Sequence, residues 1–289
     1  MSATELHRVT TDDSTLDVMR TRALETARAQ DSGRLSARIL GANWVLYPMS
    51  LILVLGAWYL AIAIFAIPPY LLPAPHAVAE SGASHMTLLL DNSLTTLLEI
   101  AAAFALCCIL GVPLGIAIAS FRVVDKLVSP ILVLSQGVPK IALAPVLLAW
   151  FGFGFKANLA IGFLIVVFPI VVNTVLGMRG VDPALLRLGK SLDASRTRLF
   201  WVVRLPAAMP SIFAGMKISV TFAAVGAIIG EFAAGSAGLG YLIQVTVGNL
   251  DMALGFAAIV ATALVGWMTY LVVEAAEKWV LRGNTQQTQ

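Results

Sequence analysis

The sequence predicts an all-α polytopic membrane protein with six transmembrane helices. Of its 289 residues 59% are hydrophobic and only 12% are charged, whereas an average soluble domain carries about 25% charged residues. Six apolar stretches are each long enough to cross a bilayer, which takes about 20 helical residues. Lys and Arg are abundant in some loops and absent from others, which predicts that both termini lie in the cytoplasm.

The apolar stretches divide the chain into a tail, a first transmembrane helix and a core. We expect a solvated tail at 1–40, because its six basic and six acidic residues leave no apolar run of the kind found in signal peptides. The part of this tail at 15–39 has the pattern of a surface helix. The first transmembrane helix is expected at 44–67. A core at 92–278 is expected to hold the other five, at 94–121, 128–151, 157–178, 211–234 and 252–273.

The third span is expected to be kinked or broken. It contains Pro130, Pro139 and Pro145, and a proline inside a helix removes a backbone hydrogen bond and clashes with the preceding turn. Lys140 follows the second of these prolines. It is a candidate for a solute path, with snorkelling of its long side chain as the alternative.

The loops give the orientation. The 121–127 loop carries two Lys or Arg and the 179–210 loop carries six, whereas the 68–93 and 235–251 loops carry none. Since basic loops remain in the cytoplasm, we expect the tail and the C-terminus on that side. Three glycines in the outer segment 235–240 predict a re-entrant or tightly turned stretch.

Small residues predict close helix packing at two places. The pairs Gly111/Gly115 and Gly226/Gly230 have the spacing that lets two transmembrane helices approach closely.

The most distinctive loop is the basic segment 182–206. Asp182 followed by Pro183 is typical of a helix N-cap with proline at the first helical position. Three leucines then share one face of the expected helix: Leu185, Leu188 and Leu192.

A second short helix is expected in the same segment. Asp193 and Ser195 interrupt the first pattern, and each can cap a new helix. We expect that helix to run through Trp201 until Pro206 ends it. Two short helices joined by a sharp turn have a shape suited to docking in a cleft of another protein.

These residues resemble the coupling segment of binding-protein-dependent ABC transporter permeases. That family's signature is Glu-Ala-Ala, three residues, Gly, nine residues, Ile, one residue and Leu-Pro. The spacing and the Leu-Pro are kept here, whereas the first Glu, both alanines and the Gly are replaced. The corresponding positions are Arg187-Leu188-Gly189, Asp193, Val203 and Leu205-Pro206. Asp can take the place of glycine in a turn because it tolerates left-handed backbone conformations.

The resemblance extends from about residue 67 to about residue 282. The stretches VPKIALAPVLLAWFG (138–152) and LPAAMPSIFAGMKI (205–218) are similar to the nitrate, sulfonate and taurine branch. The stretch VGAIIGEFAAGSAGLGYLI (225–243) is similar to permeases that serve pyrimidine-type or riboflavin-type binding proteins. The implied fold is that of a type I ABC importer permease with a cytoplasmic coupling-helix loop at 182–206.

The resemblance implies the transmembrane subunit of an ATP-driven importer of a small solute in the bacterial cytoplasmic (inner) membrane. The implied partners are a cytoplasmic ABC ATPase dimer that binds ATP and Mg²⁺, an extracytoplasmic solute-binding protein, a second permease copy in a homodimer, and membrane lipid. The chain has no Gly-x-x-x-x-Gly-Lys-Ser/Thr loop, so we expect no cofactor and no enzymatic activity of its own. The residues implied in coupling to the ATPase are Arg187, Gly189, Lys190, Ser191, Leu192, Asp193, Ala194, Ser195, Leu205 and Pro206.

Three polar residues within apolar spans are candidates for a solute path or gate: Glu231, Asn173 and Lys140. A charge at the bilayer centre costs about 3 kcal/mol on insertion scales, and less near the interface. Glu231 is expected near the outer end of its span, where it has either a solute-path or gating role or an interface or helix-packing role. Asn173 either faces a pore or hydrogen-bonds between helices. No His, Cys and Asp cluster has metal-ligand spacing, and the basic residues lie beside apolar spans. We therefore expect no metal site and no nucleic-acid partner.

Two other functions stay open from the residues alone. A stand-alone secondary transporter or channel typically has inverted repeats and buried ion-coupling charges, and the sequence has no internal repeat and few such charges. An intramembrane enzyme needs a nucleophile–base pair or metal ligands, and none is evident.

Overall fold

The computed structural model describes residues 48–281, and all its regular elements in this range are helices. The described residues fall into two units, which meet at Ala66 and Ile67. The first contains the apolar helix Pro48–Phe65, which matches most of the predicted first transmembrane helix. The predicted surface helix at 15–39 lies outside the described residues.

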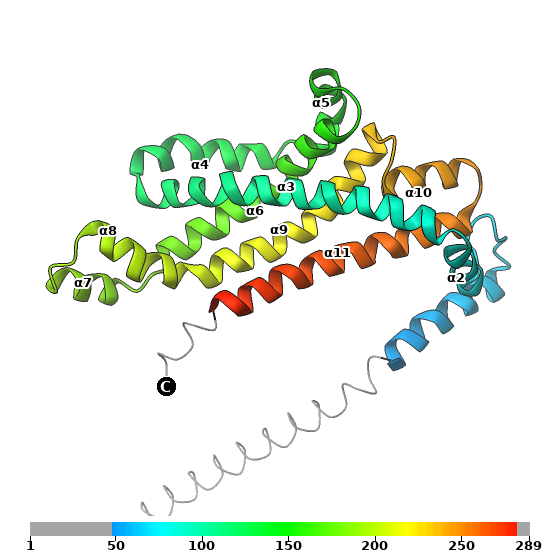
Figure 1. The fold of residues 1–289 in the computed structure, drawn as a ribbon, viewed down its shortest axis with the longest axis horizontal. Coiled ribbons are helices and arrows are strands. Elements are labelled where there is room, and N and C mark those ends of the chain that lie inside the picture. Colours follow the sequence, from blue (N-terminus) through cyan, green and yellow to red (C-terminus); the bar gives the residue numbers. More distant parts are fainter. Residues whose placement is uncertain (1–47, 282–289) are drawn as a thin grey trace, which may run out of the picture. The chain divides into compact units, whose positions relative to one another are not determined.

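The second unit is a bundle in which the long helices α3, α6, α9 and α11 run beside one another (Figure 1). Its elements in chain order are α2 (Pro75–Ser84), α3 (Met86–Ser120), α4 (Arg122–Gln136), the 3₁₀ turn η1 (Lys140–Leu143), α5 (Ala144–Phe151), α6 (Phe155–Arg179), α7 (Pro183–Ser191), α8 (Arg196–Leu199), the π-helical turn η2 (Phe200–Arg204), α9 (Leu205–Ala234), α10 (Leu239–Gly248) and α11 (Met252–Leu281).

The number of bilayer-length helices agrees with the prediction if the broken helix is counted as one span. Five described helices are long and apolar enough to cross a membrane. The sixth is the pair Arg122–Gln136 and Lys140–Phe151, bent by 96°. Pro139 lies in the break, as expected for a residue that cannot donate the backbone hydrogen bond of a continuing helix.

Glycines allow the central helices to approach closely, as their spacing predicts. A Cβ added to Gly226 of α9 would lie 2.9 Å from the Cα of Gly162 in α6, and one added to Gly115 of α3 would lie 2.6 Å from the Cβ of Thr174 in α6. Larger side chains at these two positions would separate the helices.

Two helices lie where the sequence predicts outer loops. Helix α2 falls within 68–93, and α10 falls within 235–251. Each has 10 residues, which is about 15 Å of helix and too short to cross a bilayer. A search for bilayer-length apolar stretches misses such helices, and tertiary contacts stabilise them: α2 packs on α11, and α10 packs on α9 and α11.

Candidate functional site

The first of the two predicted helices in 182–206 is present and well capped. The Ala184 N–H donates to Asp182 Oδ1 at 2.7 Å, and Pro183 begins α7. Helices α7 and α8 lie together at one end of the bundle, and α10 lies at the other (Figure 1). We call the segment 182–206 the knob.

Asp193 makes the sharp turn of the knob. Its φ is +54°, in the left-handed region that favours glycine but that Asp also tolerates. The Ala194 N–H donates to the Gly189 carbonyl oxygen at 3.0 Å and so closes the C-terminal end of α7. A Cβ at Gly189 would meet Leu199 Cδ1, so glycine here lets α7 and α8 pack against each other.

The second helix of the knob begins as predicted but does not end at Pro206. Ser195 Oγ accepts a hydrogen bond from the Arg198 N–H at 3.3 Å and caps α8. Helix α8 then continues through η2 into α9, in one span of 38 residues from Arg196 to Ala233.

The π-helical turn explains why Pro206 fails to stop the chain. The Leu205 N–H donates to the carbonyl oxygen of Phe200, five residues earlier, so the helix widens just before the proline. Pro206 then lies in the first turn of α9, where a missing N–H costs little.

The base of the knob is anchored to the bundle. Arg204 Nη2 donates to the Met178 carbonyl oxygen at 3.3 Å, near the C-terminal end of α6. Met178 packs with Ala208 and Ile212 in a buried apolar cluster.

The tip of the knob is open to the surroundings. Leu185, Leu188 and Leu192 are exposed, as are Trp201 and Val202 in η2. The sequence predicts Trp201 only as part of the second helix and does not single out Val202. Of the other predicted coupling residues, Arg187, Ser191, Asp193 and Ser195 are exposed, Gly189, Ala194, Leu205 and Pro206 are half-buried, and Lys190 lies in α7.

Two of the three candidate path residues line the same cavity. Lys140 and Asn173 border a space of about 410 Å³ together with Gln136 and the apolar side chains of α6 and α9. Lys140 Nζ donates to Gln136 Oε1 at 2.9 Å. Asn173 Nδ2 donates to the Pro169 carbonyl oxygen of its own helix at 2.9 Å.

Glu231 is not one of the residues that line this cavity. Its side chain has no exposed surface. Thr96 Oγ1 donates to Glu231 Oε1 at 2.6 Å, and the Gly240 N–H donates to Glu231 Oε2. A Cβ at Gly238 would collide with the Glu231 carboxyl group. The carboxyl group therefore caps the beginning of α10, which favours the packing role over the path role.

Glu231 belongs to a cluster of four buried polar residues and the half-buried Asn92. We define the buried polar cluster as Asn92, Thr96, Glu99, Asn158 and Glu231. Asn92 Oδ1 accepts from the Gly238 N–H, Thr96 Oγ1 accepts from the Leu239 N–H, and Glu99 Oε1 accepts from Asn158 Nδ2, each at 2.8 Å. The cluster ties α3, α6, α9 and α10 together. Its α3 members recur at i, i+4 and i+7, a pattern visible in the sequence.

Among the described residues, no group of three or more His, Cys, Asp or Glu side chains comes together as metal ligands would.

Comparison with known proteins decides the family. Residues 111–285, more than half of the chain, match the family described as binding-protein-dependent transport system inner membrane component. The chain belongs to this permease family.

The relatives are permeases of ABC systems with different solutes. The permease is 33% identical over 224 residues to a probable ABC transporter permease protein of Haemophilus influenzae, covering 78% of this chain and 90% of that protein. It is 32% identical to the riboflavin transport system permease protein RibX of Chloroflexus aurantiacus, covering 81% and 88%. It is 27% identical to the taurine transport system permease protein TauC of Escherichia coli, covering 79% and 86%.

Solved structures agree on the fold. A chain of the MetNI methionine ABC transporter in an inward-facing conformation superposes with a TM-score of 0.59 at 16% identity, over 68% of the permease and 98% of that chain. The predicted family and its importer-permease fold are confirmed.

Proposed function

We propose that the permease carries a small solute inward across the bacterial cytoplasmic membrane, driven by an ATPase that docks on the knob. The observation that carries this proposal is the contrast between the two ends of the knob. Its base is tied to α6 by Arg204, whereas the apolar tip is uncovered. A movement of the tip would therefore be transmitted to the bundle.

The surface of the knob suits a soluble protein partner. Apolar side chains that gather on an exposed segment typically mark a contact site, and Leu192 is 74% exposed. Arg187, Arg196 and Arg198 of the same segment are exposed too, and they add positive charge to its surface. An ATPase whose cleft has both apolar and acidic side chains would complement both features.

The remaining partners follow from the same proposal. The ATPase dimer supplies ATP binding and hydrolysis with Mg²⁺, an extracytoplasmic binding protein delivers the solute, and a second copy of the permease completes the pore as a homodimer. Both termini and the knob lie in the cytoplasm, in agreement with the basic loops. Relatives named for riboflavin and for taurine support a pyrimidine- or riboflavin-like solute as well as a sulfonate- or nitrate-like one.

Within the permease we assign Lys140 and Asn173 to the solute path, because they border one cavity. Glu231 is assigned to the fixed part of the bundle, since every hydrogen bond that it makes holds α3 or α10.

The test is co-purification of the ATPase with the double variant Leu192→Asp/Ala194→Asp. The two carboxylates should reduce recovery of the ATPase at least tenfold while the permease itself stays folded, because Leu192 is exposed and Ala194 is only half-buried. Leu250→Asp is the matched control: Leu250 is exposed, has a positive φ that Asp tolerates, and lies in the turn between α10 and α11. Equal ATPase recovery with the double variant and the control would overturn the docking proposal.

A further inference from the structure

Helix α4 packs on α3, and its contact with α6 is made by polar side chains. None of its residues is buried. Asp125 contacts Arg179 at the end of α6, and Gln136 contacts Lys140 of η1. A separate stripe on α4 is apolar and exposed: Val123, Leu127, Ile131 and Leu134.

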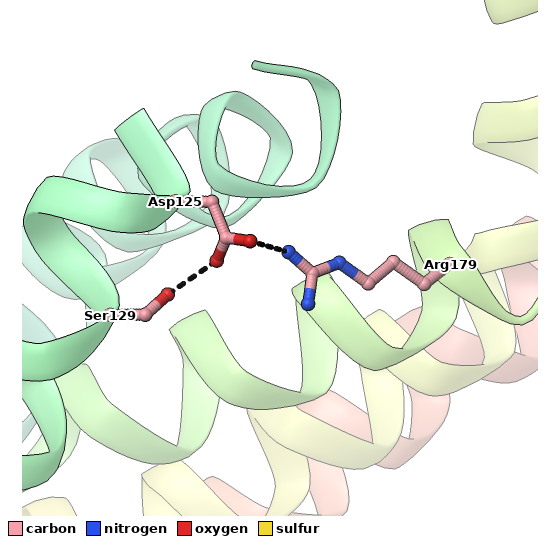
Figure 2. Close-up of polar contacts among 3 residues, drawn as sticks. All are labelled: Asp125, Ser129 and Arg179. Carbon is pink, nitrogen blue, oxygen red and sulfur yellow. Dashed lines mark hydrogen bonds and ion pairs between the residues drawn. The ribbon is translucent and has the colours of Figure 1, made fainter. Parts of the chain in front are cut away.

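The contact between α4 and α6 is an ion pair with a third member (Figure 2). Asp125 Oδ2 lies 2.7 Å from Arg179 Nη2, and Ser129 Oγ donates to Asp125 Oδ1 at 2.6 Å. The Arg179 side chain is 49% exposed and that of Asp125 33% exposed. A pair so open to its surroundings can separate at little cost in free energy, since its charges are solvated when apart.

The ion pair and the path cavity lie at different heights along the same two helices, α4 and α6. On α4, Gln136 borders the cavity and lies 11 residues after Asp125, which is about 16 Å of helix and nearly the same face. On α6, Val172 and Phe168 border the cavity and precede Arg179 by 7 and 11 residues, which again places them on its face. Helices α4 and α6 therefore run from the ion pair at one end to the cavity at the other.

We propose that Asp125 and Arg179, with Ser129 as support, form a gate that closes the inner end of the solute path between α4 and α6. The inference rests on the proposed function, because it takes this cavity to be the path. Arg179 ends α6 and only Gly180 and Val181 separate it from the knob. Movement of the knob would therefore act directly on the guanidinium group that holds α4.

The bundle offers a matched control. Lys217 Nζ lies 2.7 Å from Glu277 Oε2 and joins α9 to α11. This ion pair has the same length as the proposed gate, and neither residue borders the cavity.

The test measures access of water-soluble reagents to the cavity in the full-length chain. Gln136→Cys is introduced after Cys107→Ala and Cys108→Ala, and membrane vesicles are treated with a sulfonated, membrane-impermeant maleimide from each face in turn. With the gate intact, labelling from the cytoplasmic face should be slow. Asp125→Asn, which keeps the shape of the side chain, and Arg179→Gln should each raise that rate at least fivefold. Lys217→Gln should leave it unchanged.

The charge-swapped pair Asp125→Arg/Arg179→Asp should return the labelling rate toward that of the intact gate. Equal rates in the parent, Asp125→Asn and Arg179→Gln would overturn the inference, as would labelling only from the outer face. The measurement needs neither the ATPase nor the solute. If the labelling rates contradict the gate, the docking proposal is unaffected. If the co-purification contradicts docking, the labelling rates can still be interpreted.

Discussion

The knob and the buried polar cluster both place residues where a membrane protein should avoid them, and the structure treats them in opposite ways. The knob presents leucines and a tryptophan on a charged loop, and their side chains are left uncovered. The cluster places two carboxyl groups among apolar helices, and Glu231 has a hydrogen-bond donor for each oxygen. A polar residue such as Glu231 thus serves the fold when it is buried and hydrogen-bonded, whereas the uncovered apolar residues of the knob are available to a partner.

The largest effect is expected from a substitution in the buried polar cluster. Glu231→Leu would leave the Gly240 N–H without its acceptor and remove the hydrogen bond from Thr96, whose hydroxyl keeps only the Asn92 carbonyl oxygen at 3.2 Å. An unsatisfied buried group costs about 1–3 kcal/mol and a hydrogen bond to a charged group contributes about 1.5–3 kcal/mol, so we expect the permease to lose roughly 2–6 kcal/mol of stability. Thermal unfolding of the protein in detergent, followed by tryptophan fluorescence, would show a clearly lower Tm. Glu231→Gln keeps one acceptor oxygen, so its Tm should lie between that of the parent permease and that of Glu231→Leu. An unchanged Tm for Glu231→Leu would mean that the cluster does not hold the fold.

A smaller effect is expected from substitutions at two glycines, one in the central bundle and one in the knob. Gly226→Ala would press a Cβ against the Gly162 backbone, and overpacking of this kind costs about 1–3 kcal/mol. Gly189→Ala would meet only the end of the Leu199 side chain, which can change rotamer. Tm values should therefore fall for Gly226→Ala and stay nearly constant for Gly189→Ala. The reverse order would show that the knob, not the bundle, is the tightly packed region.

Much of the knob and of the span pattern could be predicted from local sequence. The Asp182–Pro183 cap, the turn at Asp193 and the break near Pro139 each depend on a few neighbouring residues. What the sequence missed depends on contacts between distant segments. Thr96, a partner of Glu231, lies 135 residues away in the sequence, and Asp125 contacts Arg179 although η1 and α5 lie between them in the chain. The prediction that Pro206 ends the second helix was wrong, because the effect of this proline depends on the π-helical turn before it.

The smallest effect is expected at the turn of the knob. Asp193→Gly replaces a residue at φ +54° by the one that adopts this conformation freely, so stability should change by less than about 1 kcal/mol and ATPase recovery should be retained. Asp193→Val should cost about 1–2 kcal/mol, because a β-branched side chain is strained there. Loss of ATPase binding in a folded Asp193→Gly variant would mean that the carboxylate itself contacts the partner.

The central claim is that the exposed tip of the knob meets an ATPase, and a photo-crosslinking residue in place of Leu192 tests it most directly. Irradiation of intact membranes should join the permease to a protein that mass spectrometry identifies by its Gly-x-x-x-x-Gly-Lys-Ser/Thr loop. The same residue in place of Leu250 should give no such product. Crosslinks from position 192 only to lipid, or to an extracytoplasmic protein, would contradict the account.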